Sequence, residues 1–222
     1  MTNRALRHFT ASGVLLLTLC VFAAPDFQSL VDIAESRYGA RGGVAMRAWE
    51  HLILEVADRP ETEQLALVNE FINRQLYFGD DIEIWGEKDY WATPVETLGR
   101  GMGDCEDFSI AKYITLSLLG IPLEKMRLTY VRAELGRPGS GITQAHMVLA
   151  YYPEPDGEPL ILDNLVGTLR PASRRPDLKP VYGFNSQGLW VAGQPAPVLA
   201  DPTARLSRWR DVLSRMQQEG LN

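Results

Sequence analysis

The sequence predicts an α+β fold, in which an N-terminal helical lobe precedes an antiparallel sheet that packs on one buried helix. Apolar residues recur at helical spacing in the first part of the chain, up to Phe78. From Met126 onward they alternate with a period of two, which is typical of strands. Between these parts lies an almost continuously apolar segment over residues 104–119. So little polar surface indicates a helix that is covered on every side.

Length and composition fit one domain. The chain has 222 residues, of which 45% are hydrophobic and 23% are charged, as in ordinary globular proteins. We expect a single domain over residues 24–222, with a mainly helical lobe over 24–103 and a helix and sheet lobe over 104–222. The net charge of −6 offers no basic footprint, so no nucleic-acid partner is expected. One local basic cluster is expected to be solvent-exposed surface: Arg170, Arg174, Arg175 and Lys179.

Three helices are predicted in the helical lobe. The first follows Asp26, where apolar residues recur on one face. The second spans Val44–Val56, after a break at Gly42-Gly43. The third begins near Pro60, with two glutamates in its first turn, and a short helix follows Pro94.

The remaining elements are strands and a terminal helix. A turn at residues 155–157 joins two strands into a hairpin, and residues 185–188 join another pair. The glycine-rich stretch 136–141 links two strands. The predicted strands and the final amphipathic helix are Met126–Arg132, Ala145–Tyr152, Pro159–Asp163, Tyr182–Phe184, Leu189–Ala192 and Pro202–Glu219.

Residues 1–23 are predicted to form a secretory signal peptide. Two arginines precede an apolar run over Val14–Ala24, and small or aliphatic residues near its end have the spacing that a signal peptidase accepts. A membrane span needs about 20 apolar residues, and this run is shorter. An uncleaved membrane anchor is the alternative. Lipidation of Cys20 would require a small residue where Leu19 stands. Cleavage would export the chain, leave no membrane span, and leave Cys105 as its one cysteine.

Cys105 stands at the predicted start of the buried helix. A lone cysteine in an exported chain cannot form an internal disulfide, so Cys105 is either a buried inert thiol or a reactive one. A helix N-terminus carries partial positive charge and free N–H groups, which favour a thiolate and can stabilise an oxyanion. The position therefore favours a nucleophile.

A nucleophilic cysteine needs a base and a group that orients the base. His146 is the available base, because the other two histidines lie in the leader and in the helical lobe. It shares a strand face with Val148, so its imidazole approaches the thiol if that face meets the buried helix. With the hairpin turning at residues 155–156, Asp163 lies opposite Val148 and diagonal to His146. Taken singly, His146 is more often a core or surface histidine than a catalyst, and Asp163 is more often a strand end. Their combination with Cys105 favours a catalytic set.

Six short motifs surround these three residues. They are Asp-Tyr-Trp-Ala-Thr-Pro over 89–94, Gly-Asp-Cys-Glu-Asp-Phe over 103–108, Ala-Lys-Tyr over 111–113, Gly-Ile-Pro over 120–122, Ala-His-Met-Val-Leu over 145–149 and Leu-Asp-Asn over 162–164. In this order they resemble the bacterial transglutaminase-like cysteine proteinases, and within them the LapG-type periplasmic proteases. The similarity covers residues 26–195.

The resemblance implies a papain-like, transglutaminase-like fold in which Cys105 is the nucleophile, His146 the general base and acid, and Asp163 the residue that orients the imidazole. It implies a periplasmic endopeptidase that cleaves the N-terminal region of a large surface adhesin at a dialanine-type site, which promotes biofilm dispersal. It also implies a partner, an inner-membrane cyclic-di-GMP receptor of the LapD type that sequesters the protease. Transglutaminase-type acyl transfer to an amine and a non-catalytic secreted binding module are the alternatives.

Acidic residues flank Cys105 and predict a cation site. Asp104, Glu106 and Asp107 would raise the pKa of the thiol, and a divalent cation would neutralise them; calcium prefers such carboxylate oxygens. The resemblance implies calcium dependence, with Asp104 and Glu106 as ligands. On a regular helix they would point about 200° apart, so shared coordination requires Asp104 to precede the first turn. Alternatively, the acids simply cap the helix. The acidic segment 80–81 is a candidate source of further ligands.

Overall fold

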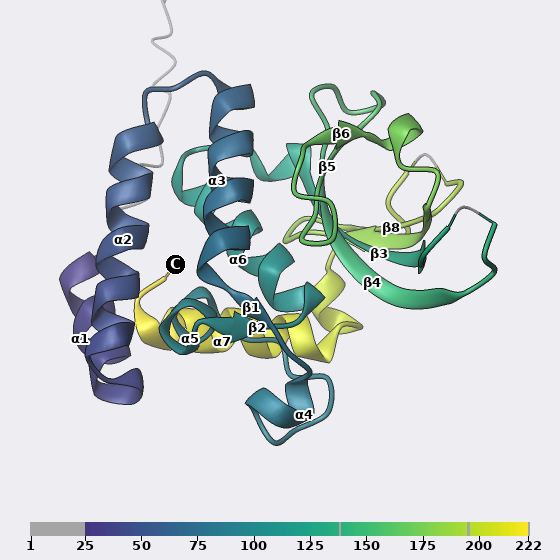
Figure 1. Ribbon diagram of the computed structural model, residues 1–222. Helices are drawn as coiled ribbons and strands as arrows, with labels where there is room; N and C mark the ends of the chain where they lie inside the picture. The colour runs from purple at the N-terminus through teal and green to yellow at the C-terminus, as the bar shows by residue number, and fades with distance from the viewer. Residues whose placement is uncertain (1–24, 138, 195, 222) are drawn as a thin grey trace, which may run out of the picture.

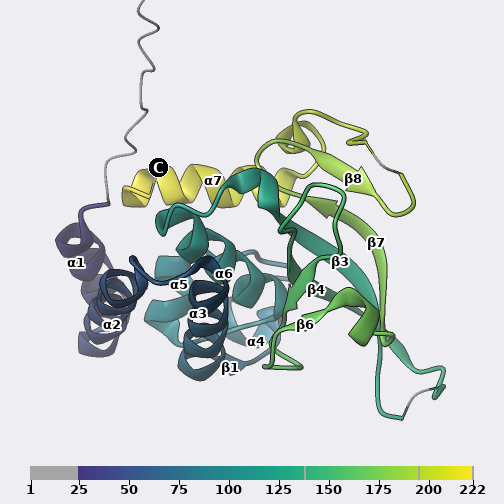
Figure 2. The ribbon, with the colours of Figure 1, turned by 90° about the horizontal axis from the view of Figure 1, so that it is seen from above.

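The computed structural model describes residues 25–137, 139–194 and 196–221, so the predicted signal peptide over residues 1–23 lies outside the described residues. Helices gather on one side of the described part and a six-stranded sheet on the other, with one helix between them (Figures 1 and 2). This is the predicted α+β arrangement. Among these residues, no helix is both long and apolar enough to cross a membrane.

Four helices build the helical lobe. The first begins after Asp26, whose carboxylate accepts the N–H groups of two first-turn residues. The last is short but almost wholly buried, and it begins with a capping box in which Thr93 and Glu96 satisfy each other's backbone N–H groups. The helices are α1 (Phe27–Tyr38), α2 (Ala40–Val56), α3 (Glu61–Gln75) and α5 (Pro94–Arg100).

The break predicted at Gly42-Gly43 is wrong, because α2 begins at Ala40 and includes both glycines. The chain turns instead at Gly39, whose φ of 72° ends α1. Gly42 is needed for packing: a Cβ there would lie 2.4 Å from the backbone oxygen of Ala34. The glycine therefore allows α1 and α2 to approach closely, which a sequence pattern alone does not reveal.

Gly42→Ala is accordingly expected to lower the free energy of unfolding by about 1 to 3 kcal/mol, because the new methyl meets the backbone of α1. Gly43→Ala is the matched control. Its Cβ would meet the flexible end of Glu35 at 2.7 Å, and alanine favours a helix over glycine by about 1 kcal/mol. Urea unfolding followed by circular dichroism compares the two variants. Equal unfolding midpoints would contradict the tight contact between α1 and α2.

The central helix is α6 (Cys105–Leu118), the predicted buried helix. Every residue from Asp107 to Leu116 is buried. On one side the indole N–H of Trp49 in α2 donates to Thr115 Oγ1 at 2.9 Å. On the other side Ser109 Oγ donates to the backbone oxygen of Met147 at 3.1 Å. Contacts from both lobes therefore fix α6 in place.

The sheet is antiparallel throughout and follows the order β6-β5-β4-β3-β7-β8. Met147 and Leu149 belong to the main core with α6, whereas Val148 and Ala150 form a small second core. The two hairpins have the predicted turns. The strands are β3 (Met126–Glu134), β4 (Thr143–Tyr151), β5 (Leu160–Leu162), β6 (Arg170–Pro171), β7 (Leu178–Phe184) and β8 (Leu189–Val191).

A short parallel strand pair was not predicted. β1 (Tyr77–Phe78) pairs with β2 (Met102–Gly103), directly before α6. Two residues are too few to show a period of two, so no sequence pattern marks them. Between the strands the chain makes an excursion over residues 79–93, which contains α4 (Asp81–Ile84) and returns to the core at α5.

The predicted terminal helix is α7 (Ser207–Glu219), which follows a short 3₁₀ helix. Trp209 is fully buried and meets the Phe184 ring edge to face, with 5.5 Å between the ring centroids. Arg208 Nε lies 2.8 Å from Asp89 Oδ2, and Arg215 donates to the backbone oxygen of Trp91. The C-terminal helix thus holds the excursion 79–93 against the body of the protein.

Candidate active site

The start of α6 has an unusually complete cap. Asp104 is the N-cap, with extended backbone (φ −98°, ψ −168°), and its carboxylate accepts the N–H groups of Glu106 and Asp107. Asp107 in turn accepts the N–H of Asp104. Cys105 is therefore the first helical residue, and Asp104 precedes the first turn, as shared coordination with Glu106 requires. The capping interpretation also holds, since the same carboxylate performs it.

Cys105 is partly buried among acids. Its thiol donates to Glu106 Oε2, with 2.7 Å between sulfur and oxygen. Burial raises the pKa of the thiol far above its ordinary value, and Glu106 and Asp104 raise it further, while a hydrogen bond from the Met147 backbone lowers it. In this arrangement the sulfur keeps its proton. Positive charge near these acids would favour the thiolate.

His146 and Asp163 form a buried pair. His146 Nε2 lies 2.8 Å from Asp163 Oδ1, and the two side chains are 1% and 0% exposed. The register pairs Leu149 with Leu162, which continues to Val148 opposite Asp163, as predicted. Burial opposes the charge of Asp163, but hydrogen bonding to His146 and other donors lowers its pKa to about 2. The carboxylate is thus ionised and can orient the imidazole.

The position of the Cys105 thiol relative to β4 differs from the prediction. The strand face shared by His146 and Val148 does not meet α6, because Val148 lies in the second core. The Cys105 sulfur instead lies beside the backbone of Met147, the residue after His146. Among the described residues no hydrogen bond joins the thiol to the imidazole, since the thiol proton is directed to Glu106.

A cluster of four carboxylates surrounds the start of α6. Ligand atoms of Asp104, Cys105 and Glu106 lie within 4.8 Å of one another, and so do those of Asp81, Asp104 and Asp107. Asp81 Oδ1 is buried and has no hydrogen-bond partner. Burial first, and then neighbouring acids, raise the pKa of Asp104 to about 10; burial raises that of Asp81 to about 6. Hard oxygen donors with an unpartnered buried oxygen fit a calcium ion.

The sequence pointed to the acidic segment 80–81, and Asp81 is the residue from it that joins the cluster. Asp107 was expected only as a neighbouring charge. Its side chain is completely buried, and Oδ1 accepts the Ala92 N–H at 2.7 Å. The three-residue spacing from Asp104 marks a capping box and was the available signal for its inward position.

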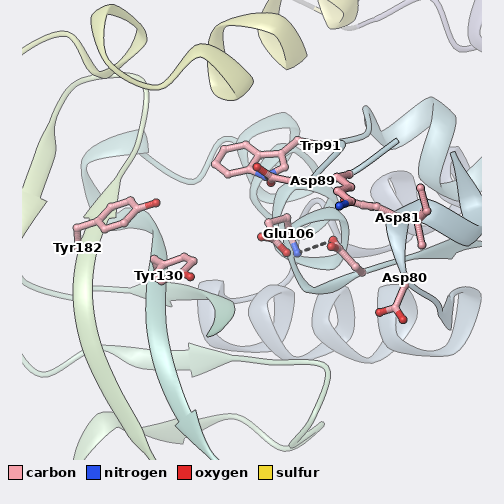
Figure 3. Close-up of a pocket in the computed structure, with 10 residues that line it drawn as sticks. Asp80, Asp81, Asp89, Trp91, Glu106, Tyr130 and Tyr182 are labelled. Atoms are coloured by element: carbon pink, nitrogen blue, oxygen red, sulfur yellow. Dashed lines mark hydrogen bonds between the residues drawn. The ribbon is translucent and has the colours of Figure 1, made fainter. Parts of the chain in front are cut away.

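An open cleft of about 460 Å³ adjoins the residues that flank Cys105. Acids from α6 and from the excursion 79–93 line one side, and Tyr130 and Tyr182 from the sheet line the other (Figure 3). The tyrosine rings are stacked, with 5.2 Å between their centroids. Trp91 lies between the two walls in the view of Figure 3. The cleft thus has a polar side and an aromatic side.

The expectation of a solvent-exposed basic cluster is wrong for Arg175. Arg170, Arg174 and Lys179 are exposed, but Arg175 is only 3% exposed. Its guanidinium lies 2.8 Å from Asp163 Oδ2. The four basic residues are close in sequence and look alike there, so no pattern showed that Arg175 is the buried one.

Comparisons with known proteins show the family of the chain. Residues 47–176 match the family model of the bacterial transglutaminase-like cysteine proteinases. LapG of Legionella pneumophila is 40% identical, with a TM-score of 0.72, over 87% of this chain and 99% of that chain. Its EGTA-treated form has a TM-score of 0.74, over 87% of this chain and 100% of that one. Its calcium-bound form has a TM-score of 0.71, over 86% and 98%, and both are 40% identical to this chain. No curated protein matches. The chain belongs to the bacterial transglutaminase-like cysteine proteinases and is a LapG-like cysteine protease.

Proposed function

We propose that this protein is a calcium-dependent cysteine endopeptidase in which Cys105 is the nucleophile, His146 the general base and acid, and Asp163 the residue that orients the imidazole. The observation that carries the proposal is the buried pair of His146, on β4, and Asp163, directly after β5, with 2.8 Å between Nε2 and Oδ1. The helix that starts at Cys105 packs against β4. The resemblance to LapG supports it.

In the proposed reaction Cys105 Sγ attacks a peptide carbonyl while His146 accepts the thiol proton. The imidazolium then donates this proton to the leaving amine, and water hydrolyses the thioester with His146 as base. The cap takes the N–H groups of Glu106 and Asp107. The N–H of Cys105 itself, at the positive end of α6, is thus the donor for the developing oxyanion.

We further propose that Asp104 and Glu106 hold calcium, with Asp81 and Asp107 as additional acids of the site. Bound calcium would supply positive charge that favours the thiolate. Glu106 would affect both the cation and the thiol, because its carboxylate accepts the hydrogen bond of the Cys105 thiol. Support comes from the carboxylate cluster, the unpartnered Asp81 Oδ1 and the calcium-bound LapG structure.

By likeness to LapG, the proposed substrate is the N-terminal region of a large surface adhesin, cut at a dialanine-type site, so that cleavage promotes biofilm dispersal. The proposed location is the periplasm, reached by a signal peptide over residues 1–23, with residues 24–222 as one mature domain. The proposed regulator is an inner-membrane cyclic-di-GMP receptor of the LapD type that sequesters the protease.

The test is cleavage of an adhesin fragment by the mature chain in calcium and in EGTA. We expect cleavage in calcium, none after chelation, and recovery when calcium is added back. A fragment with both alanines replaced by aspartate should stay intact. Asp104→Asn and Glu106→Gln should each lower kcat/KM about 100-fold at limiting calcium. Glu124→Gln, an exposed acid near the other end of α6, is the control.

Three results would overturn parts of the proposal. Full cleavage in EGTA by protein shown to be metal-free would remove calcium from the mechanism. Incorporation of a labelled amine into the fragment, without cleavage, would show acyl transfer instead of hydrolysis. No reaction with any fragment, together with no alkylation of Cys105 in calcium, would indicate a binding module.

A further inference from the structure

Arg175 is a buried cation beside the proposed triad. It lies between a 3₁₀ helix over Ala172–Arg174 and β7, in the loop expected to be solvated. Its Nη2 is 2.8 Å from Asp163 Oδ2 and 2.7 Å from Asp177 Oδ2. Its Nε donates to Asp177 Oδ1 at 3.0 Å. One guanidinium therefore bridges a fully buried carboxylate and a partly exposed one.

The two oxygens of Asp163 face different partners. Oδ1 lies 2.8 Å from His146 Nε2 and accepts the Leu165 N–H at 3.0 Å. Oδ2 faces the guanidinium of Arg175. Within the described part of the chain Oδ2 has no hydrogen-bond partner, but rotation of the carboxylate would separate it from a buried positive charge, so the ion pair with Arg175 resists rotation. The orientation of Asp163 is thus set from the side opposite the imidazole.

Lys112 cannot replace this charge. It is buried on α6, with its ammonium 5.8 Å from the centre of the Phe108 ring and within electrostatic range of Asp163. Burial lowers the pKa of Lys112 to about 7, so its charge is incomplete at neutral pH. Burial also opposes the charge of Arg175, but hydrogen bonds to Asp177 and the negative charge of Asp163 raise its pKa. Arg175 is therefore the constant counter-charge.

We infer that Arg175 is a positioning residue for the triad, which holds Asp163 ionised and turned so that Oδ1 faces His146. With Oδ1 as acceptor, the imidazole carries its proton on Nε2, and Nδ1 stays free to accept the proton of the thiol. Asp177 acts one step further away, by holding the guanidinium from its other side. The inference rests on the proposed function, since it assigns a role within the proposed triad.

Three variants of the mature chain test the inference in calcium. Arg175→Met removes the charge and keeps much of the side-chain volume. Arg175→Lys keeps the charge, but a single ammonium cannot reproduce the fork that bridges both carboxylates. Arg174→Met is the matched control, because Arg174 is the exposed neighbour in the same loop. A urea unfolding curve establishes that each variant is folded.

Nitrogen-15 NMR of histidine-labelled protein provides a readout that does not need a substrate. The chemical shifts of the two ring nitrogens report which one carries the proton, and exposed His51 serves as the internal reference. We expect one tautomer for His146 in the unmodified chain, with the proton on Nε2, and mixed tautomers in Arg175→Met. We also expect kcat for the adhesin fragment to fall about 100-fold in Arg175→Met and about tenfold in Arg175→Lys, with KM unchanged.

The inference is overturned if folded Arg175→Met keeps both kcat and the single His146 tautomer, or if Arg174→Met shows the same losses. If Arg175→Met does not fold, Arg175→Lys decides: unchanged kcat and tautomer would equally overturn the inference. Failure of the proposed function is distinguishable. In that case the unmodified chain cuts no fragment, while the NMR signal of His146 still reports whether Arg175 sets its tautomer.

Discussion

Cys105→Ala is expected to reduce cleavage of the adhesin fragment about 10⁶-fold, to the background rate. Without the sulfur no thioester forms, so neither His146 nor the backbone N–H of residue 105 has a reacting atom to act on. Cleavage by excess enzyme, followed by mass spectrometry over hours, gives the rate. The same spectra show where the fragment is cut.

The fold of Cys105→Ala should be unchanged, because the side chain is only partly buried and its thiol hydrogen bonds to neighbouring Glu106. An unfolding temperature equal to or above that of the unmodified protein would show this. Ser117→Ala, on the same helix but at its other end, is the control and should keep full activity. Cleavage that persists in Cys105→Ala would assign the nucleophile to another residue.

Asp163→Asn should have the second largest effect, with kcat reduced about 10⁴-fold. An amide offers one oxygen and one NH₂ group. If the oxygen faces His146, the NH₂ group opposes the guanidinium of Arg175, and if the amide flips, the imidazole loses its acceptor. Because a buried charge also loses a partner, we expect unfolding to become easier by about 3 kcal/mol. Asp156→Asn, in an exposed turn, should change neither kcat nor unfolding.

The contribution of Asp163 to the free energy of unfolding should change with pH only in the acidic range. Its pKa is lowered from 3.8 to about 2 in the folded protein, so the folded state binds this proton less readily than the unfolded chain. Its contribution is therefore present above about pH 4 and is lost as the pH falls towards 2. Urea unfolding at several pH values should show the difference between the unmodified chain and Asp163→Asn narrowing over that range. A constant difference would contradict the assigned pKa.

The sequence predicted the elements whose patterns are long. The stripe of α3, the uninterrupted apolar run of α6 and the two hairpins were found where expected, because burial of one face leaves a readable period. Gly42 misled the prediction of α2, since a glycine that admits a neighbouring helix looks identical to one that ends a helix. The strands β1 and β2 have two residues each and leave no pattern.

In the candidate site, residues whose position follows from a nearby helix start or hairpin could be predicted. Residues whose position depends on contacts between distant segments could not. Cys105 and Asp104 could be placed from the helix start, and Asp163 from the hairpin register. Arg175 could not, because its burial depends on a loop that folds back between Asp163 and Asp177. The distance between thiol and imidazole likewise depends on how α6 packs on β4, which no local pattern encodes.

The excursion over residues 79–93 leaves the core after β1 and returns at Thr93, the N-cap of α5. One end follows β1 and the other begins α5, and acids of the excursion form one wall of the cleft. Extending a loop with fixed ends costs little free energy. Homologous proteases can therefore change the exposed part of this wall, such as Lys88, while Asp81 and the contact between Ala92 and Asp107 stay in place. The preference for a substrate can then evolve separately from the residues that carry out the reaction.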